Sequence, residues 1–256
     1  MLRQLIAGAV ADATARSAIR PQAEVEKAAA AAAPARDALA ALAPADRVKI
    51  IAEIKRASPS RGHLSDIADP AALATRYVQG GASAISVLTE ERQFGGSLAD
   101  LEAVRAAVDV PVLRKDFIVL PYQVFEARAA GADLILLMAS ALDQADLGAL
   151  YRLVDDLGMT ALVEAHDADE VAWAADIGAK LIGINARNLT TFELDRELFG
   201  RLVDRVPAGT ITVAESAVSS AADVARYRNA GADVVLIGEA LVTADPIATL
   251  AEFLAV

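Results

Sequence analysis

Cysteine is absent from this 256-residue chain, and histidine occurs only as His63 and His166. The lack of cysteine excludes disulfides, thiolate nucleophiles, zinc–cysteine sites and iron–sulfur clusters. Two histidines argue against a histidine-rich metal centre, so we predict no metal site. We interpret His63 as a surface residue and His166 as a cap of the helix that follows it, and the single tryptophan, Trp173, as packing between a helix and its sheet.

Positive charge is also scarce, with 24 Lys and Arg against 35 Asp and Glu and a net charge of −11. A surface this acidic repels phosphate backbones and anionic membranes, which argues against nucleic acid and membranes as partners. An anionic small molecule would need a local positive pocket.

Long hydrophobic runs are missing as well, because no stretch approaches the roughly 20 apolar residues of a membrane span. The first residues, M-L-R-Q-L-I-A-G-A-V-A-D-A, faintly resemble a secretory signal. We favour an amphipathic helix, with Arg3, Asp12 and Arg16 at its polar positions. We therefore expect a cytoplasmic protein, and we favour a monomer.

From about residue 47 a two-part unit repeats: a short apolar run, then turn residues and a stretch of helical period that usually ends in Gly-Ala. Glycine suits a helix C-cap, and alanine lets the helix end lie close to the next strand. The apolar runs cover residues 48–55, 80–87, 110–115, 131–137, 159–165, 178–184, 210–216 and 231–237. The helical stretches cover Asp69–Gln79, Ser97–Val108, Pro121–Ala130, Asp143–Leu157, Asp167–Ile177, Asp195–Val206, Ser219–Ala230 and about Asp245 to the end.

This alternation predicts an α/β fold with a parallel sheet covered by helices. Eight units in about 210 residues fit a (β/α)8 TIM barrel over residues 48–256, with a doubly wound open sheet as the alternative. Residues 1–47 then form an N-terminal helical extension of the same domain, interrupted by Pro34 and Pro44. The extension could cover one end of the barrel or be a loosely packed arm.

Polar residues stand at the carboxyl ends of five of the expected strands, where an α/β barrel carries its active site. Glu53 and Lys55 lie two apart and so on one face of the first strand. The others are Lys115, Glu164, Asn185, Arg187, Glu215 and Ser216. Neighbouring acids and bases in a cleft tune each other's pKa for proton transfer. For Arg114, Asp116 and Glu90 we favour plain strand-end charges that reach solvent or pair with a neighbouring helix.

The last two barrel loops read A-E-S-A-V-S and L-I-G-E-A-L. Barrels commonly bind phosphate there, through backbone N–H groups and a short helix. Gly238 would give access to the backbone, and the Ser216 hydroxyl could donate a hydrogen bond. Glu239 should face away, because its carboxylate would oppose a phosphate.

Several motifs resemble the indole-3-glycerol phosphate synthase family. They are E-I-K-R-A-S-P-S at 53–60, F-G-G-S at 94–97, L-R-K-D-F-I at 113–118, A-L-V-E-A-H at 161–166, I-N-A-R-N-L at 184–189, A-E-S at 214–216 and I-G-E-A-L at 237–241. The resemblance covers the whole barrel. It implies conversion of 1-(o-carboxyphenylamino)-1-deoxyribulose 5-phosphate to indole-3-glycerol phosphate, carbon dioxide and water, with no cofactor.

The resemblance also implies roles for individual residues. Lys115 would be the general acid for ring closure, and Glu164 would stabilise the cationic intermediate. Lys55 and Glu53 would serve the dehydration, in an order that the sequence leaves open. The substrate-binding residues would be Asn185, Arg187 and Glu215 for positioning, Ser58, Ser216 and Gly238 with Lys55 for the phosphate, and Phe94, Phe117 and Leu189 for the aromatic ring.

One position departs from the family, which usually reads E-S-G where this chain has E-S-A, with Ala217. A Cβ there costs affinity if the backbone needs a positive φ, and little otherwise. Two other functions stay open: an aldolase that forms a Schiff base at Lys115 or Lys55, and a barrel that serves only as a scaffold.

Overall fold

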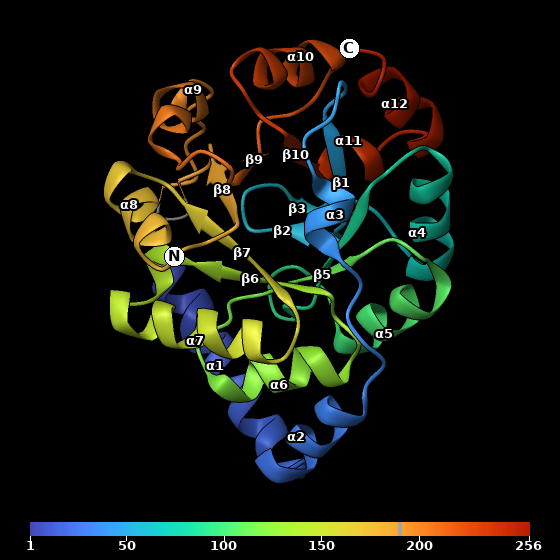
Figure 1. Ribbon diagram of the computed structural model, residues 1–256. Coiled ribbons are helices and arrows are strands. Elements are labelled where there is room, and N and C mark those ends of the chain that lie inside the picture. The colour runs from blue at the N-terminus through green and yellow to red at the C-terminus, as the bar shows by residue number, and fades with distance from the viewer. Residues whose placement is uncertain (189–190) are drawn as a thin grey trace.

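The structure, a computed structural model, describes residues 1–188 and 191–256. Its parallel strands close into a barrel in sequence order, because the first strand pairs with both the second and the last strand of the barrel. The barrel strands are β1 (Lys49–Ile54), β4 (Ala84–Leu88), β5 (Val112–Lys115), β6 (Leu134–Met138), β7 (Thr160–Ala165), β8 (Leu181–Asn185), β9 (Ile211–Glu215) and β10 (Val234–Ile237). The predicted TIM barrel is confirmed, and the open sheet is excluded (Figure 1).

Helices surround this barrel, each following a strand (Figure 1). They are α4 (Pro70–Gln79), α5 (Leu98–Ala107), α6 (Pro121–Ala129), α7 (Gln144–Asp156), α8 (Ala168–Asp176), α9 (Leu198–Leu202), α10 (Ala221–Asn229), α11 (Glu239–Val242) and α12 (Pro246–Phe253), with 3-10 turns at η1 (Ala139–Ala141) and η2 (Val203–Arg205). Most begin where an Asp or Ser side chain accepts a backbone N–H, as Asp69 does for α4 and Ser97 for α5.

Two local features differ from the prediction. The helix expected over Asp195–Val206 is only α9, followed by the 3-10 turn η2, because the Asp195 backbone N–H is bonded to the carbonyl of Ala186 and holds the preceding segment extended. The loop after β1 forms a small antiparallel hairpin of β2 (Ala57–Ser58) and β3 (Gly62–His63), for which the sequence carries no strand-length apolar run.

The N-terminal extension forms α1 (Leu2–Ile19), α2 (Gln22–Ala31) and α3 (Ala38–Leu42), and it is tightly packed. In α1, Asp12 pairs with Arg92 after β4, and Arg16 pairs with Glu126 of α6. Helix α2 lies along the outer face of α6 (Figure 1). Asp12 and Arg16, two of the three polar positions expected on α1, therefore serve to dock the helix.

The same extension reaches both ends of the barrel. Helix α1 contacts η1, which follows the carboxyl end of β6. Ahead of α3, Arg36 bonds through its backbone N–H to Asp133, just before β6, and through its guanidinium to the carbonyl of Val110, just before β5. Ala38 and Leu42 of α3 are fully buried with the residues that fill the barrel interior. The interpretation as a loosely packed arm is therefore wrong.

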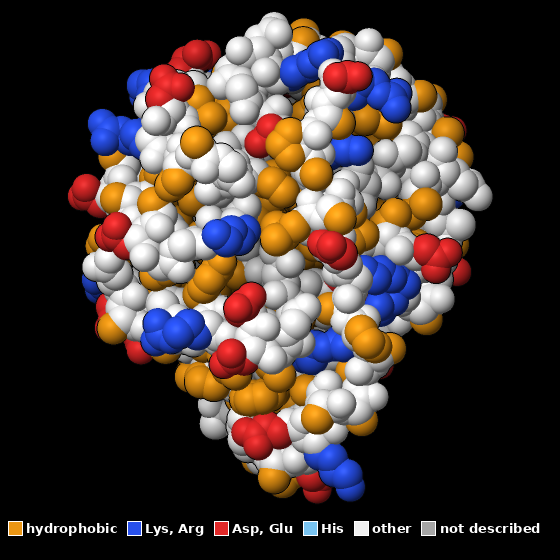
Figure 2. Space-filling model, viewed as in Figure 1, with side chains coloured by type: hydrophobic (Ala, Val, Ile, Leu, Met, Phe, Trp, Pro, Cys, Tyr) orange, Lys and Arg blue, Asp and Glu red, His pale blue; other side chains and the backbone are white. Residues whose placement is uncertain are grey.

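Apolar side chains fill two regions, the barrel interior and the layer between sheet and helices. Trp173 packs against the outer layer, as predicted. No helix in the described ranges 1–188 and 191–256 is long and apolar enough to cross a bilayer. On the face seen in Figure 2, basic and acidic side chains are interspersed, with no broad area of one sign.

Candidate active site

A pocket opens at the carboxyl ends of the barrel strands, and the predicted site residues meet there. Those that line it are Glu53, Lys55, Ser58, Phe94, Lys115, Phe117, Glu164, Asn185, Arg187, Glu215, Ser216 and Gly238. They come from seven of the barrel strands or the loops after them, which meet because parallel barrel strands end at one face. Leu189, predicted as a wall of the pocket, lies outside the described residues.

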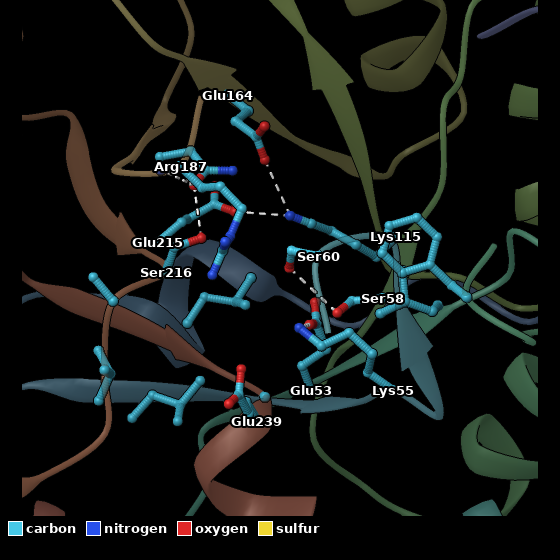
Figure 3. A pocket seen from close by; sticks show the side chains of 18 of the residues that line it. Glu53, Lys55, Ser58, Ser60, Lys115, Glu164, Arg187, Glu215, Ser216 and Glu239 are labelled. Carbon is cyan, nitrogen blue, oxygen red and sulfur yellow. Dashed lines mark hydrogen bonds and ion pairs between the residues drawn. The ribbon is translucent and has the colours of Figure 1, made fainter. Parts of the chain in front are cut away.

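At the centre of the pocket, Lys115 at the end of β5 bridges two carboxylates (Figure 3). Its Nζ lies 3.0 Å from Glu164 Oε2 at the end of β7 and 2.7 Å from Glu215 Oε2 at the end of β9. Both carboxylates are almost fully buried. A desolvated amine held between acids is a donor in fixed position, which is the arrangement that general acid chemistry requires.

The three groups shift one another's protonation. Burial alone would lower the pKa of Lys115, but the surrounding carboxylates, Glu164 foremost, raise it above its usual value. Burial alone would raise the pKa of Glu164, but the Lys115 ammonium, with His166, holds it well below its usual range. Burial, with the neighbouring Glu164 charge and against the pull of Lys115, raises the pKa of Glu215 to about 8. At neutral pH this cluster therefore holds an ammonium and an ionised Glu164, while Glu215 takes up a proton more readily than an ordinary glutamate.

A second acid–base pair lies on β1 and just after it. Lys55 Nζ is 2.8 Å from Glu53 Oε1, and the Ser86 hydroxyl donates to Glu53 Oε2 at 3.2 Å. Burial opposes ionisation of Glu53, but Lys55 and Lys115 lower its pKa below the usual value. A Cβ at Gly238 would stand 2.8 Å from Glu53 Oε1 and 3.1 Å from Lys55 Nζ, so glycine leaves room for this pair.

Gly183 in β8 supports the site and was missed by the sequence analysis. A Cβ at this position would overlap Glu215 Oε1 and would stand 3.2 Å from Leu162 Cδ1. Only glycine lets the Glu215 carboxylate lie across β8 while it contacts Lys115. The available signal was a lone glycine inside an apolar strand, L-I-G-I-N, which marks a close approach of another group.

Polar groups at the ends of β8 and β9 form a connected network. The Ser216 hydroxyl donates to Asn185 Oδ1 at 2.7 Å, and the same oxygen accepts the backbone N–H of Arg187 at 3.0 Å. The Arg187 guanidinium lines the pocket, and burial lowers its pKa. This network presents a hydroxyl and a guanidinium for binding anionic groups.

The expectation that Glu239 faces away from the pocket is wrong. Its carboxylate points into the pocket (Figure 3) and forms an ion pair with Arg61 at 2.6 Å. Arg61 stands at the turn of the β2–β3 hairpin, so a residue from a distant loop neutralises the charge that would oppose a phosphate.

Ala217 has φ +59°, directly after Ser216 with φ +68°. Both residues are therefore in the left-handed region, where a Cβ crowds the backbone and glycine is favoured. Because φ is positive, alanine at this position carries the conformational cost that the family's usual glycine would avoid.

Aromatic and aliphatic side chains form one wall of the pocket. The rings of Phe94 and Phe117 lie 6.3 Å apart and tilted by 45°, beside Met138. Glu90 is buried and accepts the backbone N–H of Phe94, so it fixes the loop and does not reach solvent. This wall suits the face of an aromatic ring.

The other strand-end charges serve the structure, but only Arg114 pairs with a neighbouring helix as predicted, because Asp116 and Glu90 are buried without reaching solvent or a helix. Arg114 is fully buried and pairs with Asp116 at 2.9 Å and with Glu126 of the neighbouring helix α6 at 3.0 Å. His63 is exposed and lies 3.2 Å from Asp66, as expected of a surface residue. Among the residues that the structure describes, no group of three or more His, Asp or Glu side chains could hold a metal ion.

The interpretation of His166 as a helix cap is wrong, because α8 is capped by Asp167. His166 Nε2 lies 3.3 Å from Glu164 Oε1. His166 ends the A-L-V-E-A-H motif, but the sequence analysis assigned it no role in the site.

Comparison with known proteins decides the family. A profile described as Indole-3-glycerol phosphate synthase matches residues 2–253. The chain belongs to the indole-3-glycerol phosphate synthase family. An indole-3-glycerol phosphate synthase of Leifsonia xyli subsp. xyli is 69% identical over 253 residues, covering 99% of this chain and 97% of the relative. Indole-3-glycerol phosphate synthase 1 of Streptomyces coelicolor is 54% identical over 256 residues, covering 100% and 95%.

Solved structures outside this synthase family share the fold alone. The 3-hexulose-6-phosphate synthase of Salmonella typhimurium has a TM-score of 0.62 at 17% identity, covering 81% of this chain and 97% of that one. The N-acetylmannosamine-6-phosphate 2-epimerase of Clostridium perfringens has a TM-score of 0.61 at 16% identity, covering 75% and 86%.

Proposed function

We propose that this protein converts 1-(o-carboxyphenylamino)-1-deoxyribulose 5-phosphate to indole-3-glycerol phosphate, carbon dioxide and water, as an enzyme of tryptophan biosynthesis. The observation that carries the proposal is Lys115 Nζ at 3.0 Å from Glu164 and 2.7 Å from Glu215, at the centre of a pocket with an aromatic wall. Family membership over residues 2–253 supports the same reaction.

Ring closure requires an acid at the substrate carbonyl while the aromatic carbon attacks it. The raised pKa of Lys115 keeps it in the ammonium form, which is the form that can give that proton. The positive charge that develops on the ring nitrogen is stabilised by a nearby anion, and Glu164 is ionised. Loss of carbon dioxide then restores the aromatic ring.

Dehydration requires an acid for the leaving hydroxyl and a base for the neighbouring carbon-bound proton. Lys55 and Glu53 supply one group of each kind, 2.8 Å apart. Arg187 suits the substrate carboxylate. We assign the phosphate to Lys55, Ser58, Ser216 and the backbone at Gly238, with Arg61 offsetting Glu239. We expect no cofactor, and a cytoplasmic location and a monomeric state stay predictions.

The two other functions fit the site less well. A Schiff-base lysine needs a lowered pKa, whereas the carboxylates raise that of Lys115. Borohydride with substrate should therefore trap no adduct. A scaffold would not need a buried lysine between two buried acids, an arrangement with a large desolvation cost.

Replacing the central lysine tests the function. In Lys115→Ala we expect kcat to fall by about 10²–10⁴-fold, the usual contribution of a positioned general acid. Indole-3-glycerol phosphate fluorescence after mixing with the substrate measures it, beside the wild-type protein and with circular dichroism as the folding control. Turnover close to wild type in this variant would refute the assigned role.

A further inference from the structure

The proposed reaction has a proton balance that the pocket must meet. One proton is needed at the substrate carbonyl and a second at the leaving hydroxyl, while one is released from carbon during dehydration. Each turnover therefore takes up one proton, since the substrate carboxylate leaves as neutral carbon dioxide. Lys115 must regain a proton from solvent before the next cycle, and Glu164 and Glu215 around it are almost fully buried.

His166 lies on the far side of Glu164 from Lys115. Its Nε2 is 3.3 Å from Glu164 Oε1, while Glu164 Oε2 contacts Lys115 Nζ at 3.0 Å. The Nδ1 of the same imidazole is 3.1 Å from Glu170 of α8. Acid and base groups therefore alternate in the order Glu170, His166, Glu164, Lys115.

The atoms that face each other in the middle of this series are available for proton transfer. Glu164 Oε1 and His166 Nε2 are both buried, and neither has a hydrogen-bond partner among the described residues. At 3.3 Å they form an ion pair whose alignment falls short of a hydrogen bond. A small turn of the imidazole brings the N–H onto the carboxylate oxygen.

A side cavity lies next to the main pocket and reaches His166. Its lining includes His166, Asn185 and Leu194, the last with 40% of its surface exposed. Glu164 lines the main pocket and His166 lines the side cavity, so this pair of residues lies between the two cavities. The charged groups around His166 are Glu164, Glu170 and, across the cavity, Glu193, Asp195 and Arg196.

We propose that His166, reached from the side cavity, is the positioning and proton-relay residue that returns a proton from solvent to Lys115 through Glu164. The inference rests on the proposed function. The His166 Nε2–H bond breaks as its proton passes to Glu164 Oε1. The carboxyl group turns, and the O–H bond then breaks as the proton joins the neutral Lys115 amine. The imidazole then turns so that the vacated Nε2 meets water in the side cavity and takes a new proton there, which restores the imidazolium and balances charge and protons over the cycle.

The protonation states give this relay its direction. Burial disfavours the imidazolium, but the carboxylates of Glu164 and Glu170 beside it raise the pKa of His166 to about 10. The residue is therefore a charged donor at neutral pH. The pKa of Lys115 is raised above its usual 10.5, so a Lys115 amine that has lost its proton is the stronger base.

The experiment compares His166→Gly and His166→Gln with the wild type, using the carboxyphenylamino-deoxyribulose phosphate and product fluorescence. We expect kcat to fall about 10–100-fold in both variants, toward the lower end of acid–base contributions, with KM within about twofold. Added imidazole should fill the space left in His166→Gly and restore kcat in a saturable way that follows the imidazolium fraction. Lys115→Ala is the matched control, and added imidazole should not raise its kcat.

Either of two results would overturn the relay. One is a wild-type kcat in His166→Gln, which keeps a neutral hydrogen-bond donor but cannot relay a proton. The other is a folded His166→Gly with reduced kcat that imidazole fails to restore; if that variant does not fold, His166→Gln alone decides. Absence of turnover in the wild type would instead overturn the proposed function itself, so the two failures are distinguishable.

Discussion

At the residue scale, Ala217 adopts a backbone conformation that costs an L-residue about 1 kcal/mol or more. Its carbonyl accepts a hydrogen bond from Arg196, so the surroundings hold the strained turn in place. The turn belongs to the loop that we assign to the phosphate.

Ala217→Gly should therefore bind substrate more tightly. We expect KM to fall about two- to fivefold, the equivalent of about 0.5–1 kcal/mol, because glycine adopts φ +59° without strain. Initial rates against substrate concentration measure it. Ala230→Gly, at a helix end with φ −80°, is the control and should leave KM unchanged. An unchanged KM in Ala217→Gly would contradict the assignment of this loop.

At Gly183, in contrast, adding a Cβ should impair catalysis. In Gly183→Ala the new Cβ overlaps Glu215 Oε1 and pushes that carboxylate away from Lys115. We expect kcat to fall by about 10²-fold, with a smaller change in KM. Gly200→Ala is the matched control, because the nearest atom to its Cβ is 3.9 Å away. Equal kcat values in the two variants would show that the position of Glu215 is not critical.

At the element scale, the periodic pattern predicted the strands and most helices to within a few residues. It did so because short stretches of sequence, namely apolar runs and N-cap residues such as Asp69 and Ser97, set where strands and helices form. It failed at α9 and at the β2–β3 hairpin, where contacts between loops set the conformation. The hairpin is also where Arg61 reaches Glu239, far away in the chain.

Breaking the Arg61–Glu239 pair should weaken substrate binding. In Arg61→Ala, Glu239 keeps its charge in the pocket without a partner, and we expect KM to rise about three- to tenfold, or about 0.7–1.4 kcal/mol of lost binding. Adding Glu239→Gln should return KM toward wild type. Arg76→Ala, which breaks an exposed ion pair with Asp245 on the outer surface, is the control for charge alone. If the double variant has the same KM as Arg61→Ala, the charge of Glu239 does not oppose phosphate binding and the assignment is wrong.

At the scale of the whole molecule, the buried ion pairs link folding to pH. The pKa of His166 rises on folding from 6.5 to about 10. A raised pKa stabilises the folded state below pH 6.5, and this contribution is lost as the pH rises toward 10. The neighbouring Glu215, raised from 4.5 to about 8, acts with the same sign at lower pH.

Thermal unfolding between pH 6.5 and 10 measures this linkage. We expect Tm to fall with pH more steeply in the wild type than in His166→Gln, because the variant lacks the titrating imidazole. Each kcal/mol of stability lost corresponds to about 2–4 °C in a protein of this size. If Tm falls equally with pH in the two proteins, the titration of His166 does not contribute to the loss of stability at alkaline pH.

Local sequence patterns were enough to predict the order of strands and helices and the face on which the polar residues gather. Local periodicity sets the elements, and closure of parallel strands brings their carboxyl ends together. Lys115, Glu164 and Glu215 could therefore be assigned to one pocket, although Glu164 and Glu215 follow Lys115 by 49 and 100 residues.

Which of those groups are in contact follows from the folded arrangement and could not be predicted. The contact of His166 with Glu164, the pairing of Glu239 with Arg61, the space above Gly183 and the positive φ of Ala217 all depend on side-chain directions and loop paths. The same holds for the extension, which reaches both ends of the barrel through the contact of α1 with η1 and through Arg36. Contacts between residues distant in the chain fix these features, and no local pattern encodes them.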